Sequence, residues 1–292
     1  MGEENRRKIV ANKLQEDGGI RYIWIETPKN FDKVYVLPMA DCHMGARQFD
    51  EKKFRGYCKW IADTPEAYCF WNGDLCNCGL PDTVDSDWWE QSPLTPQDQV
   101  QRIVEIVKDY DLDEKTLCVI GGSNHPARAR KRTGHDYDKE FAEKLGIPDL
   151  YSRDGVVMLL KVGHWQRIPV GKTRAQKPPS TQQIPYTIFA THGWAGGRLI
   201  GSSMNATREL GGVWLCDIYV TSHRHVDTVT PDLFFVPNMA HPTIEARKRM
   251  FVGSGSFLKY GGYSLAKGYR ANVSNTPRIR LDGKRKDVHV SI

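Results

Sequence analysis

The sequence predicts a protein of the α/β class, and three observations support that prediction. Apolar runs rich in β-branched residues alternate with segments of helical periodicity, which is the pattern of β-α-β units. The chain has 292 residues, of which 40% are hydrophobic and 26% charged, so a sizeable core is possible. Several apolar runs end in Asp, Asn or His, where parallel α/β sheets place their ligand sites. We therefore expect a single domain over residues 1–292.

The first half of the chain is predicted to contain β-α-β units. A polar lead-in with a short helical pattern at 1–20 precedes strands at 22–26, 33–38, 67–72 and 116–122. Asp50 is a predicted helix N-cap, and Thr64-Pro65 ends that helix. Thr95-Pro96 is predicted to open a second helix, and a third spans about 137–145, with Gly146 as its C-cap.

The second half is predicted to consist mainly of strands. We expect longer strands at 155–162, 186–190 and 213–220, and short ones at 227–230, 233–236, 250–253, 278–281 and 288–292. The segment 164–185 is rich in Pro, Lys, Gln and Thr, and is predicted to be a mobile surface loop.

Composition limits the compartment and the partners. No apolar run approaches the roughly 20 residues that span a bilayer, and the charged N-terminus lacks a secretory pattern. Seven cysteines without framework spacing indicate reduced thiols, so we expect a cytoplasmic protein without membrane partners. The net charge of +6 and the basic runs at 128–132, 247–249 and 284–286 favour a nucleic acid or nucleotide partner.

Five apolar runs end in side chains that can bind a metal. These side chains are Asp41 and His43, then Asp74, then Asn124 and His125, then His192, and finally His223 and His225. Carboxylate, amide and imidazole ligands in this number are sufficient for two divalent cations that share one carboxylate. The set is compatible with Mn, Fe, Zn, Co or Ni, with Mn expected first.

The order of these residues resembles the calcineurin-like metallophosphoesterase superfamily. The matching segments are Asp41-Cys-His43, Gly73-Asp74-Leu-Cys-Asn77, Ser123-Asn124-His125-Pro126, His192 and Ser222-His223-Arg-His225. Ser123 and Ser222 stand where the superfamily has Gly, and Pro126 stands where it has an acidic residue. The resemblance implies two packed mixed β-sheets flanked by helices, a four-layer αββα sandwich.

The resemblance also implies roles for individual residues. Asp41, His43, Asp74 and His225 would hold one metal, and Asp74, Asn124, His192 and His223 the other, so that Asp74 bridges the two. His125 would lie beside the phosphate as a catalytic residue, stabilising charge or protonating the leaving oxygen. The loss of the acidic residue at Pro126 leaves open what orients His125.

We therefore predict a metal-dependent phosphoesterase, with a phosphodiesterase or nuclease acting on DNA or another nucleic acid as the preferred interpretation. Arg128, Arg130 and Arg132 follow His125 closely and are candidate contacts to substrate phosphate. The domain-only build also resembles phosphoesterases encoded in phage genomes. A small-molecule phosphodiesterase or phosphomonoesterase and a metal-binding scaffold without catalysis are the alternatives.

Overall fold

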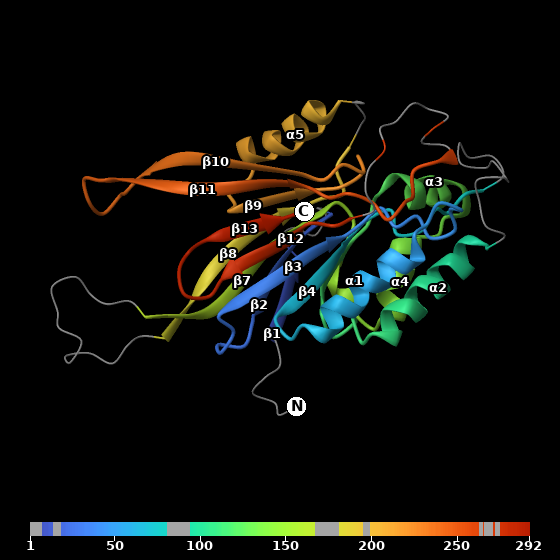
Figure 1. The fold of residues 1–292 in the computed structure, drawn as a ribbon, viewed down its shortest axis with the longest axis horizontal. Helices are drawn as coiled ribbons and strands as arrows, with labels where there is room; N and C mark the ends of the chain where they lie inside the picture. The colour runs from blue at the N-terminus through green and yellow to red at the C-terminus, as the bar shows by residue number, and fades with distance from the viewer. Residues whose placement is uncertain are drawn as a thin grey trace.

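Two mixed β-sheets pack face to face, and helices cover their outer faces, in a computed structural model that describes residues 8–13, 19–80, 94–166, 181–194, 199–262, 265, 271 and 275–292 (Figure 1). Within these residues one sheet has the strand order β13-β12-β3-β4-β5-β6, and the other has the order β1-β2-β7-β8-β9-β11-β10. The predicted α/β class and the two-sheet sandwich are confirmed.

The six-stranded sheet provides the parallel strands nearest the site. Its strands are β3 (Lys33–Met39), β4 (Ala67–Asn72), β5 (Thr116–Ile120), β6 (Tyr151–Ser152), β12 (Arg278–Asp282) and β13 (Val288–Ser291). Strands β3 to β6 run parallel, whereas β12 pairs antiparallel with β3. The carboxyl ends of β3, β4 and β5 therefore meet at one edge of this sheet.

The seven-stranded sheet mixes parallel and antiparallel pairs. Its strands are β1 (Lys8–Lys13), β2 (Ile20–Glu26), β7 (Gly155–Gln166), β8 (Thr181–Ala190), β9 (Ile218–Thr221), β10 (Thr228–Pro237) and β11 (Ile244–Gly253). Strands β8 and β9 are parallel neighbours, so the residues that follow them also lie at a common edge.

Local sequence signals place the starts of the first two helices. The helices are α1 (Glu51–Asp63), α2 (Pro96–Asp109), α3 (Asn124–Thr133), α4 (Tyr137–Lys144) and α5 (Ile200–Glu209), with short 3-10 turns at Pro148–Leu150 and Leu210–Gly212. The Asp50 carboxylate accepts the N–H of Lys53 at the start of α1, and Thr95 forms a capping box with Asp98 at the start of α2. These caps confirm the predicted helix starts.

Three apolar clusters hold the layers together. The cluster between the sheets joins side chains such as Val36 of β3 and Met158 of β7. A second cluster packs α1, α2 and α4 against the six-stranded sheet, and a smaller one with Phe251 and Leu210 lies on the outer side of the seven-stranded sheet, where α5 contacts β11. Burial on both faces explains why every residue of β4 and β5 is buried.

Several sequence-based expectations are wrong in detail. Residues 8–13 form a strand paired with β2, although a polar lead-in with a helical pattern was predicted there. Strands β7 and β8 pair through Gln166 and Thr181, so the ends of the predicted 164–185 loop are strand, and 167–180 lie outside the described residues. Antiparallel pairing supplies backbone partners that composition does not reveal.

Two helices lie in segments for which no helix was predicted. The basic run at 128–132 lies within α3, and the polar segment before Gly211 contains α5. Strand β9 begins only at Ile218, so 213–217 are not strand. Neither helix has a side-chain hydrogen bond at its N-cap, which explains why no start signal was recognised.

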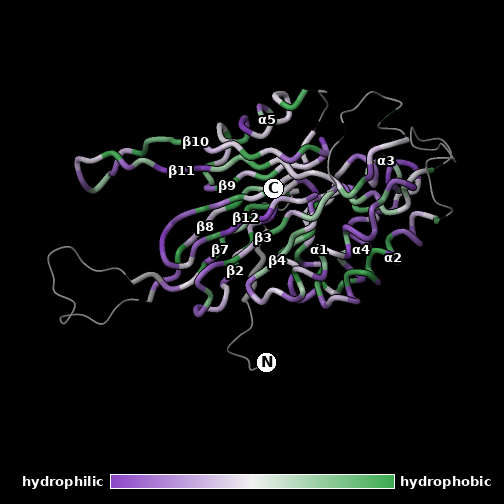
Figure 2. The backbone as a smooth tube through the Cα atoms, viewed as in Figure 1, coloured by the Kyte–Doolittle hydropathy of each residue, from purple (hydrophilic) through white to green (hydrophobic). Residues whose placement is uncertain are grey.

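The β10–β11 hairpin projects beyond the rest of its sheet (Figure 1). Its two strands pair from Thr228–Gly253 to Pro237–Ile244 as one continuous ladder, whereas two short strands were predicted for 227–236. Leu233 and Phe235 are 55% and 66% exposed on it, and Figure 2 shows both hydrophobic and hydrophilic stretches along the projecting part.

Two further expectations concern the whole chain. The seven cysteines all belong to described residues and are buried thiols without disulfides, as predicted. In the part of the chain that the structure describes, no helix combines the length and apolar character needed to cross a membrane.

Candidate metal centre

The candidate site lies where the carboxyl ends of strands from both sheets meet. Asp41 and His43 follow β3, Asp74 follows β4, and Asn124 and His125 open α3 shortly after β5. From the other sheet, His192 follows β8, and His223 and His225 follow β9. The fold thus brings together all eight candidate residues, although Asp41 and His225 are 184 positions apart by their numbers.

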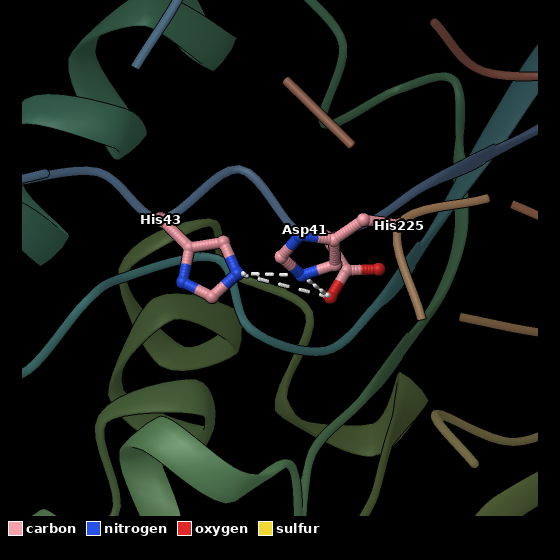
Figure 3. A group of neighbouring side chains, drawn as sticks. All are labelled: Asp41, His43 and His225. Carbon is pink, nitrogen blue, oxygen red and sulfur yellow. Dashed lines mark hydrogen bonds and ion pairs between the residues drawn. The ribbon is translucent and has the colours of Figure 1, made fainter. Parts of the chain in front are cut away.

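The first group comprises Asp41, His43 and His225 (Figure 3). The Nε2 atoms of His43 and His225 lie 3.1 Å apart. Asp41 Oδ1 is 3.2 Å from His225 Nε2 and 3.8 Å from His43 Nε2. Three ligand atoms therefore converge on one small volume, and Asp41 is fully buried.

The second group comprises Asp74, His192 and His223. Asp74 Oδ2 lies 3.2 Å from His192 Nε2, while the other ring nitrogen of His192 contacts the backbone oxygen of Asn72 at 2.7 Å. Donation from Nδ1 to that oxygen leaves Nε2 as the nitrogen that faces Asp74. His192 is thus held by the strand end of the opposite sheet.

Asp74 and His43 also form a third group with His125. Asp74 therefore belongs to the second and third groups, and the third group shares His43 with the first. The His125 N–H donates to Asp74 Oδ1 at 3.1 Å, and the His43 and His125 rings meet edge to face at 4.5 Å between centroids. The superfamily resemblance does not imply that His125 is a metal ligand. In the third group, its ring nevertheless lies beside both Asp74 and His43.

Asn124 lies at the outer side of the second group. Its amide nitrogen is 3.2 Å from His223 Nε2, and the side chain is exposed. The His223 backbone N–H donates to Asp41 Oδ2 at 2.9 Å, so the second group is tied to the first.

Electrostatics in the site reflect burial and close pairing. Burial lowers the pKa of His192, but the adjacent Asp74 carboxylate outweighs it and raises that pKa to about 9. Burial favours neutral Asp74, yet His192 and His125 outweigh it and hold the Asp74 pKa well below its usual range. Burial lowers the His43 pKa well below 6.5, so this ring is a neutral imidazole, the form that binds metals.

Buried side-chain atoms that make no hydrogen bond indicate whether divalent cations suit this site. Among the described residues, three buried side-chain atoms make no hydrogen bond: Asp41 Oδ1, His192 Nε2 and Asn72 Oδ1. The first two lie 3.2 Å from an oppositely charged or ionisable group, His225 Nε2 and Asp74 Oδ2 respectively. The first two belong to the two metal-type groups. An unsatisfied buried carboxylate oxygen or imidazole nitrogen is costly, and a cation satisfies both. The mixed oxygen and nitrogen donors therefore fit divalent transition metals.

The backbone at the site adopts an uncommon conformation. Within the described residues seven non-glycine residues have positive φ, and five of them are Asp41, His43, Asp74, His223 and His225, with φ between 47° and 70°. Each such residue costs on the order of 1–2 kcal/mol. Strain of this kind concentrates at functional sites, because surrounding structure must hold it in place. No sequence pattern revealed this feature.

Three contacts missed by the sequence reasoning support the candidate ligands. The Asp74 backbone N–H donates to Ser123 Oγ at 2.8 Å, and Ser123 Oγ lies 3.3 Å from Asp138 Oδ2. Asn72 Nδ2 donates to Ser222 Oγ at 2.7 Å. The two serines that depart from the superfamily's glycines therefore bind neighbouring groups, and those departures were the available signal.

The orientation of His125 has a different source from the acidic residue absent at Pro126. His125 Nδ1 contacts the backbone oxygen of Asn77 at 3.1 Å. Donation to this carbonyl fixes the ring without a carboxylate.

The three predicted phosphate-binding arginines lie along α3. Arg128 donates to the Asn124 backbone oxygen at 3.2 Å, and Arg130 pairs with Asp136 at 3.2 Å. Arg132 is exposed near the end of the helix. Their contact with substrate stays a prediction, as do the ligand roles of the eight site residues.

Comparison with known proteins was made at three levels. No family model and no curated protein sequence matches the chain. Solved structures similar to it include a predicted phosphoesterase from Streptococcus pneumoniae TIGR4, with 14% identity, a TM-score of 0.32 and coverage of 88% of each chain. A metallophosphoesterase from Sphaerobacter thermophilus has 12% identity, a TM-score of 0.34 and coverage of 89% of this chain and 88% of its own.

Vacuolar protein sorting 29 from Cryptosporidium parvum is similar at 16% identity and a TM-score of 0.35, over 90% of this chain and 97% of its own. Two of these three structures are phosphoesterases by name. At these TM-scores, only the chain's own geometry supports a functional proposal.

Proposed function

We propose that this chain is a phosphodiesterase that uses two divalent metal ions and acts on nucleic acid. The observation that supports it most directly is the position of Asp74, which belongs to the second group and has a ligand-type atom within 4.8 Å of one on His43, a member of the first group. A shared carboxylate between two such groups is the arrangement that a dinuclear site requires.

The two proposed metal positions differ in the exposure of their ligands. Asp41, His43, Asp74 and His225 would hold one ion, and Asp74, Asn124, His192 and His223 the other, with Mn²⁺ the first candidate. When bound, such a pair neutralises phosphoryl oxygens and makes a water nucleophilic near neutral pH. The second group is more open, because Asn124 is exposed and His223 is only half-buried.

His125 is the proposed acid for the leaving oxygen. Its Nδ1 contacts the Asn77 carbonyl at 3.1 Å, so Nε2 is the nitrogen left to carry a transferable proton. Its backbone N–H is fixed on Asp74 at 3.1 Å, which keeps the ring beside the candidate metal ligands. These two contacts support the proposed role of His125 as the proton donor to a displaced alkoxide.

A nucleic acid is the proposed substrate because of the charge around the site. The chain carries a net charge of +6, and α3, which begins with Asn124, carries a run of basic residues in its last turn. Such a helix suits a polyanion better than a small ester with a single phosphate. The small-molecule esterase is the second candidate.

The first test is hydrolysis of bis-p-nitrophenyl phosphate and p-nitrophenyl phosphate with and without Mn²⁺. We expect Mn²⁺-dependent cleavage that favours the diester and falls about 10²-fold or more in His125→Ala, with Mn²⁺ still bound. His135→Ala is the matched control, because His135 is an exposed histidine paired with Glu140. Faster monoester cleavage would favour a phosphatase, and bound metal without any turnover would favour the scaffold.

The second test compares DNA and RNA oligonucleotides over a salt series. Hydrolysis that weakens steeply with salt is expected of a nuclease, because backbone binding releases counterions. Salt-independent turnover of small diesters alone would contradict the nucleic acid substrate.

A further inference from the structure

A cavity of about 360 Å³ lies beside the start of α1, outside the candidate metal centre. Its lining residues are Asp50, Lys52, Lys53, Gly56, Tyr57 and Arg278. Three of these side chains are cationic, and they come from the first turn of α1 and the first residue of β12. None of them belongs to the motifs that indicated the metal site.

Backbone hydrogen bonds connect this cavity to the metal centre. The Asp50 N–H donates to the Phe257 oxygen at 2.7 Å, and the Phe257 N–H donates to the Asp41 oxygen at 3.1 Å. Each such pairing joins Cα atoms about 5 Å apart, so the cavity wall lies on the order of 10 Å from Asp41. Both features occupy the same end of the sheet, since Arg278 opens the strand that pairs antiparallel with β3.

The cationic groups of the cavity lack acidic partners. Among the described residues, Lys52, Lys53 and Arg278 form no ion pair, whereas most other basic side chains of α1 do, such as Arg55 with Glu51. The carboxylate of Asp50 already accepts the Lys53 backbone N–H as a helix cap, and Lys259 Nζ lies 4.0 Å from it. Asp50 is the one carboxylate among the described lining residues, so the cavity as a whole carries a net positive charge, which favours a bound anion.

Arg278 is fixed in place by aromatic rings. Its guanidinium carbon lies 4.6 Å from the centroid of Trp60 and 5.5 Å from that of Tyr57. The Tyr57 hydroxyl donates to Asn275 Oδ1, so this ring is held as well. A guanidinium held over aromatic rings can still offer N–H groups to a phosphate, and little rotamer entropy is lost on binding.

We propose that this cavity binds a backbone phosphate of the nucleic-acid strand whose scissile phosphate lies at the metal centre. The inference rests on the proposed function and narrows it to substrates with several phosphates. A strand carries one phosphate per nucleotide, so a second phosphate falls at a distance of the order separating the cavity from Asp41. A diester with a single phosphate cannot occupy both places.

The test measures binding of a fluorescent single-stranded oligodeoxynucleotide by anisotropy over a KCl series. Lys52→Gln and Arg278→Gln should each weaken binding roughly three- to tenfold at low salt and reduce the salt slope by about 0.7. Lys59→Gln is the matched control, because Lys59 also lies on α1 but pairs with Asp63. Lys52 is exposed, so its replacement leaves the fold intact if Arg278→Gln does not fold.

Hydrolysis provides an independent measurement. The ratio of kcat/KM for the oligonucleotide to kcat/KM for bis-p-nitrophenyl phosphate should fall about three- to tenfold in both variants and stay at the wild-type value in Lys59→Gln. If neither substrate is cleaved by any variant, the proposed function fails, while the anisotropy result still decides the cavity.

Two results would overturn the inference. One is a salt slope in Lys52→Gln and Arg278→Gln equal to that of the wild type. The other is unchanged oligonucleotide binding together with a Tm rise on adding inorganic phosphate that the wild type shows and Arg278→Gln lacks. That second result would assign the cavity to free phosphate.

Discussion

The metal centre and the cationic cavity both hold charged or ionisable side chains close together at one edge of the sheets. Repulsion between like charges is reduced in a different way in each. In the metal centre the carboxylates of Asp41 and Asp74 are buried, so water cannot shield them and imidazoles surround them. In the cavity Lys52 and Lys53 are exposed, and solvent screens their repulsion. Removing one charged side chain should therefore reduce stability strongly in the metal centre and only slightly in the cavity.

Replacing the shared carboxylate is expected to have the largest effect. Asp74→Asn removes the negative charge between the two groups while keeping the shape of the side chain. We expect Mn²⁺-dependent diesterase activity to fall by about 10³-fold, with Mn²⁺ binding measured by calorimetry also weakened. Asp63→Asn, on the surface of α1, is the control. Retained activity in Asp74→Asn would contradict the dinuclear proposal.

Metal addition should stabilise the protein by a predictable amount. Free Mn²⁺ at 100 times its Kd is expected to add about 2.7 kcal/mol to the free energy of unfolding, and chelation should remove it. Denaturant unfolding with and without EDTA measures the difference. An equal gain in Asp74→Asn would show that Mn²⁺ binds elsewhere.

Removing a supporting hydroxyl should have a smaller effect on both stability and metal affinity. Ser123→Ala leaves the buried Asp74 N–H without its acceptor, so we expect a loss of about 1–3 kcal/mol. Mn²⁺ affinity should fall roughly 10- to 100-fold, because Ser123 also fixes the strand end that carries Asp74. Ser291→Ala, at the exposed end of β13, is the control, and similar losses in the two variants would refute the special role of Ser123.

Asp138 provides the pH-dependent comparison, and the expected effect is the smallest. Burial raises the pKa of this carboxyl well above its usual value, with Asp136 and Asp74 adding to the rise. The folded state therefore holds the proton more tightly, and wild-type stability declines as pH rises from the unfolded pKa near 4 to the folded pKa. Asp138→Asn lacks this titration.

We therefore expect wild type to lose more than about 1 kcal/mol relative to Asp138→Asn between pH 4 and pH 8. Urea unfolding in EDTA measures this without bound metal. Parallel stability curves for the two proteins would show that folding does not shift the pKa of Asp138.

Local signals in the sequence predicted what depends on neighbours along the chain. The caps of α1 and α2 and the buried run of β4 follow from short-range chemistry, so the bounds of α1 and β4 and the start of α2 were predicted within one or two residues. The candidate ligands were found because strand ends of parallel units meet at one edge. The structure shows that these side chains lie close together, and their metal-binding role stays a prediction.

Features that depend on contacts between distant parts of the chain could not be predicted from the sequence. The contact between Ser123 and Asp138 depends on how α4 packs behind the site, and the cavity joins α1 to a strand more than 200 residues later. The helix α5 and the paired strand β1 depend on tertiary partners rather than on cap residues. Positive φ at five site residues is likewise imposed by the surrounding fold.

The hydrogen bond from the His223 N–H to Asp41 Oδ2 joins residues 182 positions apart. Closing so long a segment is an unfavourable step that must precede any contact it creates. Because the first metal-type group needs both strand ends, a refolding chain acquires that group only when its two sheets dock. Metal uptake during refolding should consequently report on the last stage of assembly, and not on early collapse.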